Sequence, residues 1–193
     1  GFILFFYGRN SKKNINFIEQ LIFILISYLL ASILIAIPFY LSNYQVTFVN
    51  AIFESISGLT GTGFSIFKNI KYLDPTLILW RSSAQWIGGL FFLFFLIIIF
   101  SNKSFNYKMT NLTYSGDNNF NSEENIKDNI LRIFIIYSVL SILILTLLNL
   151  SGLRLFNSLN MSMTLISGGG FLPTYTIKKI FSSNFQKMIF IFS

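Results

Sequence analysis

The chain has 193 residues, of which 53% are hydrophobic and only 11% charged, and it contains neither histidine nor cysteine. This composition excludes an ordinary soluble domain and predicts an integral membrane protein. The missing cysteines exclude disulfides and thiolate metal sites, and the missing histidines argue against most hydrolases and zinc enzymes, so we expect no enzyme. The net charge is +7, but Lys and Arg are scattered along the chain, so we expect no nucleic-acid partner.

Three segments carry no charged residue and are long enough to cross the core of a bilayer, which takes about 20 apolar residues. They are residues 21–41, 82–100 and 133–153. The apolar runs at residues 1–8 and 188–193 are too short to cross, which suggests a fragment of a longer membrane protein. We therefore predict an all-α integral membrane fold that is truncated and in contact with membrane lipid.

A short helix is predicted between the first two segments, at residues 46–57. The Gly/Thr-rich stretch Ser57–Phe64 and a polar turn at residues 68–75 follow it. A helix of about twelve residues rises only about 18 Å, so it can enter the membrane but not cross it. This arrangement predicts a re-entrant loop. Irregular backbone at such depth is tolerated only where it is buried in protein or lines a watery path.

The chain contains an internal repeat, because residues 50–64 align without a gap with residues 157–171. Internal repeats are common in transport proteins. Five positions are identical in the two copies: Asn50 and Asn157, Ser55 and Ser162, Gly61 and Gly168, Gly63 and Gly170, Phe64 and Phe171.

The repeat predicts four parts of the chain. Residues 1–13 are the end of a preceding helix and a basic turn, and residues 14–100 are a first helix–pore-loop–helix repeat. Residues 101–128 are a polar cytoplasmic connector, in which Ser122 is a candidate helix cap. Residues 129–193 are a second repeat, truncated before its last helix.

Glycine loops at membrane depth can direct several backbone carbonyls to one place, since no side chain obstructs them and positive φ costs glycine little. Rings of carbonyls replace the hydration shell of K⁺ in channel filters of the TVGYG type. Thr62-Gly63-Phe64 and Gly169-Gly170-Phe171 parallel the Val-Gly-Tyr core of that signature, although Ser65 and Leu172 replace its second glycine. The pattern predicts an ion filter of reduced symmetry. The alternative is that the glycines only let helices pack closely.

Glu54 is the only acidic residue in a segment predicted to lie inside the membrane, and such residues are functional candidates by default. It could attract cations near a pore. However, Met161 stands at the same place in the second copy, which favours a structural role for Glu54, such as pairing with Arg81 or with a backbone amide.

The residues at the start of the second apolar segment are expected to anchor and pack it. Trp80, Arg81 and Trp86 are predicted to lie at the membrane interface, and Gly88 and Gly89 to allow close helix contact. The two sides of the predicted topology carry seven Lys and Arg each, so the positive-inside rule does not orient the chain.

Three runs of the chain, in this order, resemble the Trk/Ktr/HKT superfamily of potassium transporters, and the Trk-type membrane (pore) subunit most closely. They are "LLASILIAIPFYLS" (29–42), "NAIFESISGLTGTGFS" (50–65) and "LWRSSAQWIGGL" (79–90). "FNSLNMSMTLISGGGF" (156–171) resembles the second pore loop of this family. The resemblance covers residues 12–175, and the run from Trp80 to Gly89 is its most specific part.

The resemblance implies four repeats around one pore, in the inner (plasma) membrane, with the loops facing outside. It implies a homodimer, a cytosolic nucleotide-binding regulatory subunit and no covalent cofactor. Its implied filter residues are Thr60, Gly61, Thr62, Gly63, Ser167, Gly168, Gly169 and Gly170, with K⁺ held by the carbonyls of residues 61–63 and 168–170. Thr is more usual than glycine at Gly61 and Gly168, so the resemblance leaves the choice between K⁺ and Na⁺ open.

These observations predict potassium uptake through a backbone-carbonyl filter, without covalent chemistry. One alternative is a sodium-permeable or poorly selective cation transporter of the same fold. An alternative of another class is a non-conducting membrane assembly subunit whose glycines only pack helices. Two loops cannot close a four-part ring, so we expect the chain alone to conduct only if copies associate.

Overall fold

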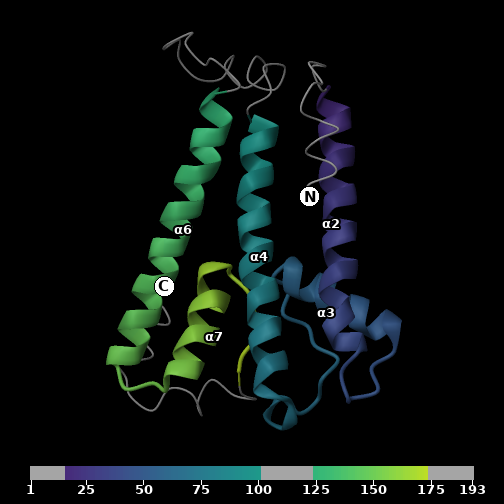
Figure 1. The fold of residues 1–193 in the computed structure, drawn as a ribbon, viewed down its shortest axis with the longest axis vertical. Coiled ribbons are helices and arrows are strands. Elements are labelled where there is room, and N and C mark those ends of the chain that lie inside the picture. Colours follow the sequence, from purple (N-terminus) through teal and green to yellow (C-terminus); the bar gives the residue numbers. More distant parts are fainter. Residues whose placement is uncertain (1–15, 101–123, 174–193) are drawn as a thin grey trace.

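The computed structural model describes residues 16–100 and 124–173, and these residues form a helical bundle (Figure 1). Its elements in chain order are α2 (Phe17–Tyr40), α3 (Phe48–Leu59), the short 3-10 helix η1 (Ile70–Tyr72), α4 (Pro75–Phe100), α6 (Glu124–Leu150) and α7 (Leu155–Ile166). In this described part, three helices are long and apolar enough to cross a membrane, namely α2, α4 and α6. The all-α membrane fold is therefore confirmed.

The long helices extend beyond the apolar segments from which they were predicted. α4 begins at Pro75 rather than at residue 82, because proline suits the first turn of a helix and the Asp74 carbonyl accepts the N–H groups of Leu77 and Ile78. α6 begins at Glu124, so residues 124–128 of the predicted connector are helical. The predictions for residues 1–13, for Ser122 and for the truncation of the second repeat before its last helix lie outside the described residues.

The two short helices lie beside the lower halves of the long ones and end near each other, next to α4 (Figure 1). Each has 12 residues, and their bounds correspond in the internal alignment, Phe48 with Leu155 and Leu59 with Ile166. The residues that follow them, Thr60 and Ser167, have nearly the same backbone angles, with φ of −86° and −84°. The repeat found in the sequence is thus a structural repeat of short helix and loop.

α4 lies between the two copies and contacts α2, α3, α6 and α7. Two glycines let its neighbours approach. A Cβ added to Gly88 would lie 2.7 Å from the carbonyl carbon of Leu59, at the end of α3. A Cβ added to Gly89 would lie 3.0 Å from the Cβ of Ser167, just after α7. The predicted close packing at Gly88 and Gly89 is confirmed.

The predicted interface anchors of α4 contact other helices, and their place at the membrane interface stays a prediction. The indole N–H of Trp80 donates to the carbonyl of Ile35 at 3.0 Å, and that of Trp86 donates to the hydroxyl of Ser141 at 2.9 Å. Arg81 is only 1% exposed. These groups find hydrogen-bond partners inside the protein, so they tie α4 to α2, α3 and α6.

Candidate functional site

The two glycine loops that follow α3 and α7 are in direct backbone contact. A Cβ added to Gly63 would lie 2.6 Å from the Cα of Gly170, and one added to Gly170 would lie 3.1 Å from the Cα of Gly63. Beside them, a Cβ added to Gly61 would lie 3.7 Å from the carbonyl oxygen of Ser167. At the Gly63–Gly170 contact the backbones of the two loops lie so close together that no side chain fits between them.

Glycine is also required by the backbone conformation of the loops. Gly61 and Gly168, which correspond in the repeat, have φ of +69° and +65°, and Gly63 has φ of +76°. Left-handed φ is strained for residues with a Cβ, and more so for β-branched ones. The predicted loop residues therefore lie together, and three of their five glycines, Gly61, Gly63 and Gly168, have a backbone conformation that favours glycine.

A hydroxyl of each short helix holds the carbonyl of the phenylalanine that follows the loop. Ser57 donates to the carbonyl of Phe64 at 2.6 Å, and Thr164 donates to the carbonyl of Phe171 at 3.0 Å. Both the donors and the acceptors occupy corresponding positions of the repeat. An alignment scored on identity misses this pair, because Ser faces Thr; an alignment that scores hydroxyl groups together detects it.

Thr164→Val is expected to lower the free energy of unfolding by about 1–3 kcal/mol, because the buried carbonyl of Phe171 loses its hydroxyl donor. Thr146→Val is the matched control, since Thr146 is exposed on α6 and bonds only within its helix. We expect the control to change stability by less than about 0.5 kcal/mol. Thermal unfolding in detergent measures both, and equal losses would contradict the role of Thr164.

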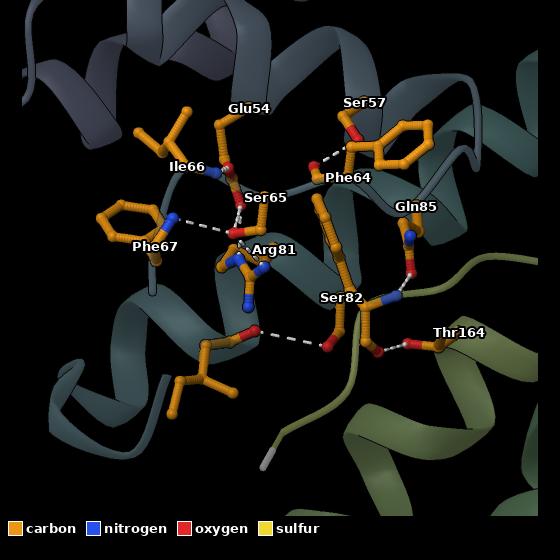
Figure 2. A network of polar contacts seen from close by, with 12 residues as sticks. Glu54, Ser57, Phe64, Ser65, Ile66, Phe67, Arg81, Ser82, Gln85 and Thr164 are labelled. Carbon is orange, nitrogen blue, oxygen red and sulfur yellow. Dashed lines mark hydrogen bonds and ion pairs between the residues drawn. The ribbon is translucent and has the colours of Figure 1, made fainter. Parts of the chain in front are cut away.

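Glu54 is fully buried and holds the backbone beyond the first loop (Figure 2). One carboxylate oxygen accepts from Nε of Arg81 at 2.7 Å and from the hydroxyl of Ser65 at 3.0 Å. The other accepts the N–H of Ile66 at 2.8 Å. The sequence-based expectation of a partner in Arg81 or in a backbone amide is confirmed for both. The bonds of its two oxygens favour the structural role over attraction of a passing cation.

Comparison with known proteins agrees with this arrangement. The protein-family model TrkH, described as "Cation transport protein", matches residues 4–181. The chain belongs to the TrkH cation transport protein family. It is therefore part of a multi-pass membrane protein of the Trk type, and its family is one of transporters and not of enzymes.

Two relatives illustrate this similarity. The chain is 33% identical over 178 residues to an uncharacterized cation transporter, MJ1485, of Methanocaldococcus jannaschii, which covers 88% of this chain and 35% of the relative. It is 26% identical over 165 residues to the Trk system potassium uptake protein TrkG of Escherichia coli, which covers 79% of this chain and 32% of the relative. The chain thus spans about a third of the length of these two relatives.

A solved structure shows the same TrkH fold. The crystal structure of the potassium transporter TrkH from Vibrio parahaemolyticus superposes with a TM-score of 0.70 at 22% sequence identity. The match covers 99% of this chain and 40% of that one. At this identity the likeness shows the fold, and the helix–loop–helix architecture of the chain is that of TrkH.

Proposed function

We propose that the chain contributes to potassium uptake through a filter of backbone carbonyls from its two glycine loops. The observation that carries the proposal is the pair of loops with an equivalent hydroxyl-to-carbonyl hydrogen bond and matching φ at Gly61 and Gly168, in backbone contact at Gly63 and Gly170. Two such neighbours can supply adjacent parts of one ring of carbonyls, the arrangement that replaces the hydration shell of K⁺. The ligands would be the carbonyls of residues 61–63 and 168–170, flanked by Thr60 and Ser167.

The proposal extends to the setting of the pore. The loops would face the outside of the inner (plasma) membrane, two copies would associate, and a cytosolic nucleotide-binding subunit would regulate them. The names of the Trk system potassium uptake protein TrkG and the potassium transporter TrkH support potassium as the ion, and the Trk system in the name of TrkG supports further subunits as partners. A sodium-permeable transporter of the same fold is the second candidate, favoured by glycine instead of Thr at positions 61 and 168.

The Gly63→Ala and Gly170→Ala variants test the filter. In cells that lack K⁺ uptake and express the complete gene product, we expect each variant to lower uptake of K⁺ or its tracer Rb⁺ by about tenfold or more, which corresponds to about 1.4 kcal/mol on the barrier. The reason is that a methyl group at either position forces the two loops apart. Uptake is measured per amount of protein in the membrane, with K⁺ and Na⁺ supplied separately.

Gly152→Ala is the control for this test. Gly152 also has positive φ, +94°, but a Cβ there would meet no atom within 4 Å, and it lies in the turn between α6 and α7. It therefore carries the same kind of backbone strain away from the loops. Normal K⁺ uptake and ion preference in both loop variants would overturn the filter and favour glycines that only pack helices. Uptake of Na⁺ as fast as K⁺ by the unaltered protein would favour the second candidate.

A further inference from the structure

One face of α4 connects the two loops through Arg81 and Gln85, which lie one helical turn apart. On the side of the first loop, Arg81 donates to Glu54 at 2.7 Å and to the hydroxyl of Ser65 at 2.9 Å. In the chain the two acceptors precede and follow the first glycine loop, and in space they lie side by side (Figure 2). The guanidinium is thereby fixed in position by the first repeat.

The same guanidinium lies on a residue of the second repeat. Its Cζ is 4.1 Å from the centre of the ring of Phe171, the residue that directly follows the three glycines of the second loop. An arginine over an aromatic face is attracted by the ring quadrupole, and the attraction increases where water is excluded. Both Arg81 and Phe171 are almost completely buried, at 1% and 2% exposed.

Gln85 holds the backbone of the second loop beside this stack. Its Oε1 accepts the N–H of Phe171 at 3.3 Å, and its amide packs against Gly169, where a Cβ would lie 2.6 Å from Nε2. The carbonyl of Phe171 is bound by Thr164. The ring, the N–H and the carbonyl of Phe171 are therefore each held by a different side chain, two of which belong to α4 of the first repeat.

The two copies of the repeat differ at this point. Phe64, the counterpart of Phe171, is 70% exposed, and Met161 and Leu172 replace Glu54 and Ser65. Residues 155–172 thus lack an acid and a hydroxyl at the places where the first copy binds Arg81. Within the described residues, Arg81 of the first repeat instead contacts the second loop through the ring of Phe171.

We propose that Arg81, oriented by Glu54 and stacked on Phe171, is a positioning residue that sets the geometry of the second loop and thereby the ion preference of the pore. This proposal rests on the proposed function of the loops as a filter. Arg81 acts through Phe171, whose backbone continues directly from Gly170. Lysine cannot replace it, because an ammonium group has no planar face to stack and no Nε to pair with Glu54 in the same geometry.

Arg81→Lys and Phe171→Leu test the proposal in the complete gene product, expressed in cells that lack K⁺ uptake. The readout is the ratio of Rb⁺ to Na⁺ uptake in the same cells, which does not depend on how much protein reaches the membrane. We expect both variants to lower the ratio by about threefold or more. A factor of this size matches the energy of the weaker cation–π interactions in proteins. Arg132→Lys and Phe53→Leu are matched controls at exposed positions of α6 and α3 and should keep the ratio of the unaltered protein.

The melting temperature in detergent separates positioning from a purely structural role. A lower melting temperature with an unchanged Rb⁺/Na⁺ ratio in either variant would overturn the proposal and leave the filter intact. Absence of Rb⁺ uptake by the unaltered protein would overturn the proposed function, and this proposal with it. If one variant fails to reach the membrane, the ratio of the other decides, because each removes one partner of the same stack.

Discussion

Gly88→Ala is expected to destabilise the protein by about 3 kcal/mol, at the upper end of the usual cost of adding a methyl group to a packed interior. The new Cβ would lie 2.7 Å from both the Cα and the carbonyl carbon of Leu59, and nearer still to its carbonyl oxygen. These are backbone atoms at the end of α3, so no side-chain rotation relieves the overlap. α3 and α4 have to separate, and the first loop begins one residue after Leu59.

The sign of this effect is informative, because helix propensity acts in the opposite direction. In a helix interior, alanine is favoured over glycine by about 1 kcal/mol. If Gly88 had no close neighbours, its substitution by alanine would therefore stabilise the protein. Thermal unfolding in detergent gives the sign. Gly58→Ala is the control with a milder overlap, since a Cβ there would meet only side-chain atoms of Ala84 and Phe171, at 3.1 and 3.3 Å. A melting temperature of Gly88→Ala at or above that of the unaltered protein would contradict the close α3–α4 packing.

The architecture was predictable because it rests on local patterns. The apolar lengths identify α2, α4 and α6, and the gapless internal alignment identifies α3 and α7 as copies. Glycines such as Gly63 could be recognised from the sequence, because they occupy positions that have no room for a side chain. Whether their carbonyls hold an ion stays a prediction.

The contacts between the copies were not predictable, because they join residues far apart in the chain. Gln85 and Phe171 are 86 positions apart, and neither lies in a recognisable motif with the other. The start of α4 is not predictable from the apolar run for a related reason. Arg81 precedes the charge-free segment 82–100, yet it is buried in the protein because its partner Glu54 lies 27 positions earlier in the chain.

Glu54→Met is expected to lower the free energy of unfolding by about 3–5 kcal/mol, because it leaves the charge of Arg81 buried and unpaired. The N–H of Ile66 and the hydroxyl of Ser65 lose an acceptor at the same time. Methionine is the matched replacement, since Met161 occupies the equivalent place in α7 and is fully buried there. Chemical or thermal unfolding in detergent measures the loss, and a variant as stable as the unaltered protein would show that Arg81 finds another partner.

The double variant Glu54→Met with Arg81→Met distinguishes what the ion pair does for folding from what it does for transport. Replacing a buried ion pair by apolar side chains is often neutral for stability, so we expect the double variant to recover most of the loss of the single one. It still lacks the guanidinium that lies on Phe171, so its Rb⁺/Na⁺ ratio should remain altered. Recovered stability with an altered ratio means that the pair is needed to place the second loop. Recovery of both would mean that apolar packing alone places Phe171.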